Sequence, residues 1–167
     1  YYRRSDPKMM SHIAHVLQRF NGGMSCINIY VNQHDFFISK HRIVEAEKIG
    51  ASPEWSQIAD PNSVPPRSEP SLDALYTEIK RTVELEAQII AAVFPTPLLV
   101  MQLFLRRVFA QSVQTYVETI MQRALDADAK VLGTTRHDTS IDVAGLAFLR
   151  MLHVTRSATL MLVADLK

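Results

Sequence analysis

The sequence predicts an all-α fold, an antiparallel helical bundle or part of a longer helical rod. Three observations support this prediction. After residue 70, apolar residues recur at intervals of three and four through three consecutive segments. Proline and glycine residues separate these segments. With 167 residues, 47% of them hydrophobic and 21% charged, the chain has the composition of a globular protein that buries a core.

Residues 1–51 are expected to form the N-terminal helices of the bundle. Asp6-Pro7 is a helix-start signal, because Asp6 accepts hydrogen bonds from free amides and Pro7 lacks only a donor that the first turn does not use. The sequence Asn21-Gly22-Gly23 predicts the end of this helix. The segment 26–38 fits both a strand and a helix, and its length favours the helix. Ser39 is expected to cap a short helix that ends near Gly50.

Residues 52–70 are expected to form a proline-rich surface loop of the same bundle. Five prolines are interleaved here with Asp, Asn and Ser, a pattern that prevents a long helix. Trp55 lies in this stretch and is expected to pin the loop to the bundle or to face a partner.

Residues 71–167 are expected to form three long amphipathic helices, the first capped by Ser71 and the third starting at Ser140. We place Glu86 on the polar side of the first helix and expect Gly145 to allow a close approach between helices. The predicted apolar stripes are Leu72, Leu75, Tyr76, Ile79, Val83, Ile90 and Val93; Leu98, Met101, Leu105, Val108, Phe109, Tyr116, Val117, Ile120, Met121 and Leu125; and Ile141, Phe148, Leu149, Leu152 and Leu160.

Charge and cysteine content narrow the class of protein. The net charge of +1 does not favour nucleic acid or an anionic membrane, and basic residues form only short pairs, Arg3-Arg4 and Arg106-Arg107. The single cysteine, Cys26, excludes an internal disulfide and suits a reducing compartment. The longest apolar run, 95–105, is too short to span a bilayer. The chain begins without Met and ends within a helical pattern, so we expect a piece of a longer polypeptide.

No catalytic, cofactor or metal site is predicted. His12 and His15 share a helical face but lack further ligands at a recognised spacing, and His34-Asp35 is interpreted as a pair that fixes a turn. Cys26 is interpreted as a small core residue, and the five glycines build no phosphate-binding loop. The remaining candidates are partner-binding residues: Arg106, Arg107, Trp55 and Met151.

Three runs carry a resemblance to a known family: RFNGG at 19–23, YVNQHDFFI at 30–38, and FLRRVFAQSVQTYVETIMQRAL at 104–125, with VFP at 93–95 before the last. They resemble the fungal form of the exocyst subunit of the Sec-ten type. The resemblance extends over most of the chain and implies an interior piece of an elongated rod of helical bundles, the type shared by multisubunit tethering complexes. The matching residues are packing residues and mark no active site.

The resemblance implies a non-catalytic role in tethering secretory vesicles to the plasma membrane before fusion. The expected partners are other exocyst subunits, especially the neighbouring vesicle-side subunit, with small GTPase-linked vesicle machinery as a further expectation. Membrane contact would be indirect, no cofactor is implied, and the location would be cytoplasmic, peripheral at vesicles and sites of exocytosis. Two alternatives stay open: an F-box protein of the recyclin type acting in membrane recycling, and a helical-bundle enzyme whose site is assembled from scattered residues.

Overall fold

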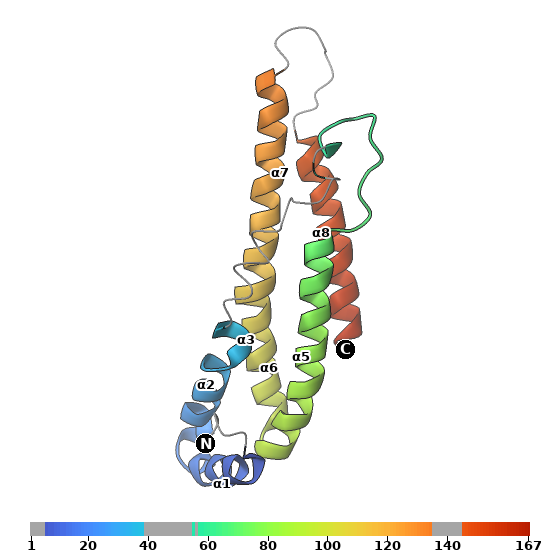
Figure 1. Ribbon diagram of the computed structural model, residues 1–167. Helices are drawn as coiled ribbons and strands as arrows, with labels where there is room; N and C mark the ends of the chain where they lie inside the picture. The colour runs from blue at the N-terminus through green and yellow to red at the C-terminus, as the bar shows by residue number, and fades with distance from the viewer. Residues whose placement is uncertain (1–5, 39–54, 56, 135–144) are drawn as a thin grey trace. The chain divides into compact units, whose positions relative to one another are not determined.

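The prediction of an all-α helical bundle is confirmed. The computed structural model describes residues 6–38, 55, 57–134 and 145–167, and its regular elements in these ranges are all helical (Figure 1). The predicted helix after Ser39, the pair Arg3-Arg4 and the helix start at Ser140 lie outside the described residues. The helices are α1 (Pro7–Gln18), η2 (Asn21–Gly23), α2 (Met24–Asn32), α3 (Asp35–Ile38), α5 (Pro70–Val93), α6 (Pro97–Arg107), η4 (Val108–Val113), α7 (Gln114–Thr134) and α8 (Leu146–Asp165).

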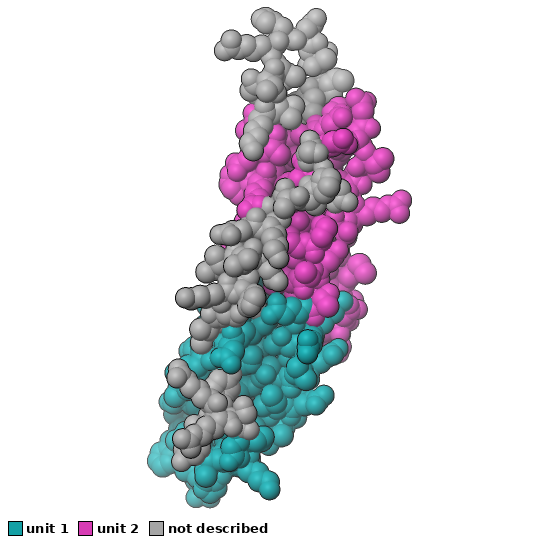
Figure 2. Space-filling model, in the orientation of Figure 1, with its two compact units in different colours: residues 1–39, 78–113 teal, residues 40–77, 114–167 magenta. Residues whose placement is uncertain are grey.

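The helices form two compact units, each built from segments that are distant in the sequence (Figure 2). Unit 1 combines residues 1–39 with residues 78–113, and unit 2 combines residues 40–77 with residues 114–167. The predicted division into residues 1–51, 52–70 and 71–167 follows chain order and remains a prediction. The units follow tertiary packing instead, so the boundary falls inside α5 and between η4 and α7.

In unit 1, the start and end of α1 agree with the sequence signals. The Asp6 side chain accepts hydrogen bonds from the amides of Lys8 and Met9, and Pro7 occupies the first turn. After α1, Asn21, Gly22 and Gly23 all have positive φ angles, of 53°, 60° and 72°. A left-handed backbone at three consecutive positions ends α1 and turns the chain before α2, and glycine adopts it without steric cost.

The ambiguous segment 26–38 is helical, as favoured, but it is broken between α2 and α3. Its buried residues, Ile27, Tyr30, Val31 and Phe36, pack in the core of unit 1. Contacts between α2 and α6 hold this core together. The ring centroids of Tyr30 and Phe94 lie 5.0 Å apart in an edge-to-face arrangement, a favourable geometry for aromatic pairs.

The π-helix η4 explains how Val113 is buried in unit 1. Val100, Phe104 and Val108 are fully buried at intervals of four, and the buried residues Ser112 and Val113 follow Val108 after four and five residues. In an α-helix, a step of five would turn the side chain away from the core. The hydrogen bonds of a π-helix connect residues i and i+5, so residues five apart lie on the same face. The predicted stripe is offset before this point, in α6, where Leu98, Met101 and Leu105 were predicted but Val100 and Phe104 are buried.

In unit 2, α7 and α8 pack against each other. The carboxylate of Asp128, on α7, accepts hydrogen bonds from the amides of Ala147 (2.9 Å) and Phe148 (3.1 Å) and so satisfies free donors in the first turn of α8. Gly145 precedes this helix with a φ of 91°, and a Cβ there would meet no atom within 4 Å. The expected role of Gly145 in close helix approach is thus wrong: it provides a left-handed backbone.

Helix α5 begins at Pro70 and is capped by Glu69 instead of by Ser71 as predicted. The Glu69 carboxylate, 3% exposed, accepts hydrogen bonds from the amide of Leu72 (2.7 Å) and from the Ser71 hydroxyl. All seven residues of the stripe predicted for this helix are buried. Glu86, which we placed on the polar side, is buried as well and continues the stripe between Val83 and Ile90. The chemical type of a glutamate does not show that it is buried; only its position on the helix can indicate this.

Helix α8 buries a different face from the one predicted. Ala147, Met151, Val154, Thr155 and Leu162 are buried, whereas the predicted residues Leu149, Leu152 and Leu160 are exposed. Among the described residues, α8 is also the one helix long and apolar enough to cross a membrane by length and composition, a test that helices of soluble cores also pass. The helix is apolar on two sides, so periodicity did not identify the buried one.

Two leucines of α8 provide a matched test of this packing. Leu162 is 1% exposed and Leu160 is 55% exposed. We expect Leu162→Ala to lower the free energy of unfolding by about 2–5 kcal/mol, because it leaves a cavity, and Leu160→Ala to change it by less than about 0.5 kcal/mol. Urea denaturation followed by circular dichroism measures both. Equal losses in the two variants would show that the structure assigns the wrong face of α8 to the core.

Candidate interaction surface

Arg106 and Arg107, both predicted as partner-binding residues, lie in different environments. Arg106 is exposed. Arg107 is partly buried, and its guanidinium donates hydrogen bonds to the carbonyl oxygen of Val31 (2.8 Å) and to the side chains of Asn32 and Gln111 (2.9 Å to Gln111). Its guanidinium carbon also lies 4.5 Å from the ring centroid of Phe37.

Arg107 therefore stabilises the C-terminal end of α2. The carbonyl of Val31 is in the last turn of α2, where carbonyl groups lack helical partners and a positive charge is favourable. The stacking on Phe37 adds a cation–π contact. Of the pair, Arg106 is the exposed one, and its role in partner binding remains a prediction.

Replacing each arginine with glutamate tests whether Arg107, and not Arg106, stabilises the fold. We expect Arg107→Glu to lower the free energy of unfolding by about 1–3 kcal/mol, because the carbonyl and amide oxygens then face a carboxylate. Arg106→Glu is expected to leave it within about 0.5 kcal/mol. Thermal and urea denaturation of both variants test this. A loss at Arg106 as large as that at Arg107 would contradict the assigned positions.

Trp55 and Met151 were the other two predicted partner-binding residues. Trp55 is partly exposed, which leaves both of its expected roles open. Met151 is 1% exposed and lies in the core of unit 2, so its side chain is not at the described surface. A role in partner binding remains a prediction for both residues.

A buried polar cluster, formed by Tyr30, His34 and Glu86, joins α2 to α5 in unit 1. His34 and Glu86 are 7% and 8% exposed, and the His34 Nε2 atom lies 3.0 Å from a Glu86 carboxylate oxygen. The Tyr30 hydroxyl donates to the other carboxylate oxygen. The amide of Phe36 donates to Nδ1 of His34 at 3.1 Å, so Nδ1 acts as an acceptor and Nε2 carries the proton that faces Glu86.

The cluster keeps Glu86 ionised in the core. Burial opposes ionisation and is the largest single influence, but the hydrogen bonds from His34 and Tyr30 lower the pKa of Glu86 below its ordinary value. Sequence reasoning paired His34 with its neighbour Asp35 and did not find Glu86, which lies on another helix. Only the helical phase of Glu86, in line with Val83 and Ile90, could have indicated it.

The lowered pKa of Glu86 predicts a dependence of stability on pH. A carboxylate with a lowered folded pKa stabilises the protein above its unfolded pKa, and this contribution is lost as pH falls through the folded pKa. We expect Glu86→Gln to be less stable at pH 7 by about 1–3 kcal/mol and to lose less stability than the parent between pH 6 and pH 3.

Urea denaturation at a series of pH values measures this difference. Glu84→Gln is the matched control, since Glu84 is exposed on the same helix. Parallel pH profiles for the parent and Glu86→Gln would show that Glu86 is not preferentially ionised in the folded state.

The remaining candidates from the sequence are metal-binding side chains. In residues 6–38, 55, 57–134 and 145–167, no three His, Cys, Asp or Glu side chains form a group that would hold a metal ion. His12 and His15 are both exposed, and Nδ1 of His15 lies 2.8 Å from the carbonyl oxygen of Ser11.

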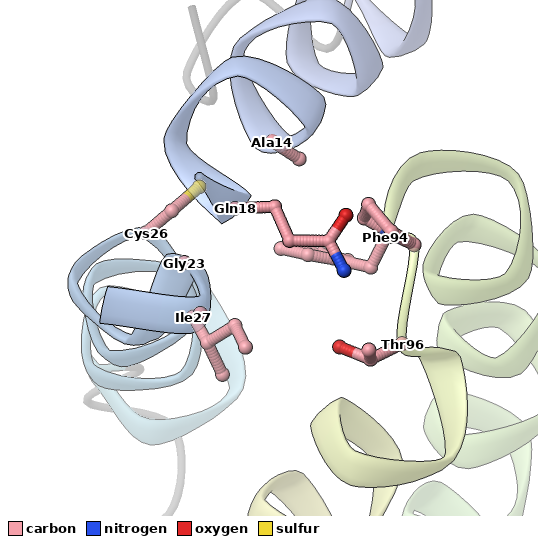
Figure 3. A pocket seen from close by; sticks show the side chains of 9 residues that line it. Ala14, Gln18, Gly23, Cys26, Ile27, Phe94 and Thr96 are labelled. Atoms are coloured by element: carbon pink, nitrogen blue, oxygen red, sulfur yellow. The ribbon is translucent and has the colours of Figure 1, made fainter. Parts of the chain in front are cut away.

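Cys26 lines a small hollow between α1, α2 and the turn after α5, together with Ala14, Gln18, Ile27, Phe94 and Thr96 (Figure 3). The hollow has room for about one water molecule. Burial raises the pKa of the Cys26 thiol, which keeps it protonated and weakly nucleophilic at neutral pH.

The exposed side of α8 is the candidate interaction surface of unit 2. Leu149, Leu152 and Leu160 are 61%, 43% and 55% exposed, and their spacing places them on one side of the helix, opposite the residues that pack in the core. Arg156, also exposed, lies between them. We call these three leucines the α8 leucine face. An apolar helix side of this kind is suited to packing against another helix.

The fold and this surface define the chain as a helical bundle with an apolar helix side open to further packing. Compared with known families, all of residues 1–167 match the model described as the α-helical bundle of the Sec10-like exocyst complex component. The chain belongs to this family.

Curated relatives agree with this assignment. The chain is similar to exocyst complex component SEC10 of Saccharomyces cerevisiae, with 28% identity over 91% of the chain and 16% of the relative. It is also similar to SEC10a of Arabidopsis thaliana, with 32% identity over 99% of the chain and 18% of the relative. Exocyst complex component 5 of Oryza sativa subsp. japonica is 30% identical over 71% of the chain and 14% of the relative. The chain thus spans less than a fifth of these proteins' lengths, and no solved structure matches it.

Proposed function

We propose that this chain is a non-catalytic segment of an exocyst subunit that takes part in tethering secretory vesicles to the plasma membrane before fusion. The observation that carries the proposal is the match of the whole chain, residues 1–167, to the helical bundle of the Sec10-like exocyst component. The rest of the subunit would continue the elongated rod of helical bundles that we expect from the sequence. The protein would act in the cytoplasm, at the periphery of vesicles and sites of exocytosis.

Protein–protein contact through helices is the mode of action that we propose. The α8 leucine face leaves three large apolar side chains in water on one helix side. Covering such a side chain contributes roughly 1.5–3 kcal/mol if it becomes fully buried, so a partner helix gains most from this place. We propose that an amphipathic helix of another exocyst subunit, the neighbouring vesicle-side subunit in particular, occupies the α8 leucine face.

Contacts with membranes would be indirect in this proposal. The net charge of +1 provides little attraction to anionic lipids. Small GTPase-linked vesicle machinery would then act through the assembled complex. The exocyst names of the curated relatives favour the tethering role over an F-box protein of the recyclin type.

Charge substitution on α8 tests the proposed contact. In the full-length subunit, we expect Leu149→Glu with Leu160→Glu to reduce co-purification of other exocyst subunits at least about tenfold, since two carboxylates would have to be buried against the partner helix. The matched control is Leu85→Glu, on the exposed side of α5, where the parent leucine is 52% exposed. The control is expected to co-purify the complex at the parent level.

Thermal denaturation of the same proteins identifies what covers the face. Unchanged melting with reduced co-purification supports contact with another subunit. A lower melting temperature of the full-length subunit with unchanged co-purification would mean that another helix of the same polypeptide covers the α8 leucine face, and it would contradict the proposed contact.

A further inference from the structure

The segment Val64–Arg67, with the sequence Val-Pro-Pro-Arg, is an exposed extended stretch in unit 2. It contains neither helix nor strand, and it belongs to the loop that leads to α5, drawn as an open arch in Figure 1. Val64 is 85% exposed, the most exposed large apolar residue among those described, and Pro65 and Arg67 are exposed as well. Exposure of a large apolar side chain to water is unfavourable, so the exposure of Val64 beside two prolines and an arginine calls for an explanation.

The local sequence fixes the backbone of this segment. Each proline ring holds φ near −65°, and a residue before proline is driven into the extended or polyproline II region. Pro65 and Pro66 are restricted by their own rings, and Val64 and Pro65 are restricted because each precedes a proline. In an ideal polyproline II helix, which has three residues per turn, residues three apart such as Val64 and Arg67 share an edge. Neither proline has an amide donor, which leaves the carbonyl groups as the backbone atoms that a partner can contact.

Both ends of the segment are anchored to unit 2. On the N-terminal side, the guanidinium of Arg150, on α8, donates to the carbonyl oxygens of Ile58 (2.8 Å), Asp60 (2.9 Å) and Ser63 (2.9 Å) and to the Ser63 hydroxyl (2.9 Å). On the C-terminal side, buried Glu69 caps α5 through the amide of Leu72. These contacts restrict both ends of the intervening segment, and such restriction lowers the entropy cost of binding.

We propose that Val64–Arg67 is a docking ligand for a protein domain with an aromatic-lined polyproline groove, of the SH3 or WW kind. Such grooves accept an apolar residue followed by proline between aromatic rings, and they recognise the preformed polyproline II helix. Val64-Pro65 supplies this unit. Arg67 supplies a cation on the same edge for an acidic or aromatic group beside the groove. The proposal goes beyond the tethering role and rests on none of its contacts.

An array of recombinant SH3 and WW domains, probed with the purified labelled chain, tests the proposal, and the affinity of each domain that binds is then measured by isothermal titration. We expect Pro65→Ala with Pro66→Ala to weaken binding at least about tenfold, because the fixed backbone and the proline contact are both lost. Arg67→Glu is expected to weaken binding several-fold, with a larger loss at low salt. The domain class that binds shows which kind of groove is used.

Pro61→Ala is the matched control. Pro61 is an exposed proline in the same loop, between the Asp60 and Ser63 acceptors of Arg150 and outside the segment Val64–Arg67, and its substitution is expected to leave affinity within about twofold. Circular dichroism melts of all variants confirm an unchanged fold. The proposal is overturned if no domain on the array binds the parent chain, or if Pro61→Ala weakens binding as much as the double variant does.

Discussion

The burial of one apolar side on each helix is the constraint on which both units depend. In α5 that side runs without a break from Leu72 to Val93, and every large apolar residue on it is at most 7% exposed. Because each helix offers only a narrow stripe, the helices must be covered by segments that are distant in the sequence. Residues 1–39 thus pack with residues 78–113, and residues 40–77 pack with residues 114–167. Helix α8 departs from this rule, since it is apolar on a second side as well.

Polar side chains join segments that are separate in the sequence. Asp128, on α7, accepts hydrogen bonds from amides in the first turn of α8, and Arg107, at the end of α6, donates to the carbonyl oxygen of Val31 in the last turn of α2. Arg150 holds the loop at residues 58–63, and Glu86 joins α5 to α2 through the Tyr30 hydroxyl. The buried groups among these have hydrogen-bond partners in this way.

Sequence patterns predicted the parts of the fold that depend on near neighbours. The Asp6-Pro7 start of α1 and the Asn21–Gly23 stop are local, and the stripe of α5 has one clear apolar side. The buried face of α8 could not be predicted, because both of its sides are apolar and the choice depends on α7. Of the candidate site residues, Arg106 is exposed, whereas the contacts of Arg107 depend on α2, more than 70 residues away in the chain. Contacts between residues so far apart in the chain cannot be predicted from the local spacing of residues.

The π-helix at Val108–Val113 has a consequence for comparing this chain with its relatives. Its wider turn brings Val113, five residues after Val108, to the same face as Val108. A turn of this kind takes up an added residue locally, because the hydrogen-bonding pattern widens there. We therefore expect a relative with one residue fewer at positions 108–113 to have a regular helix at this point.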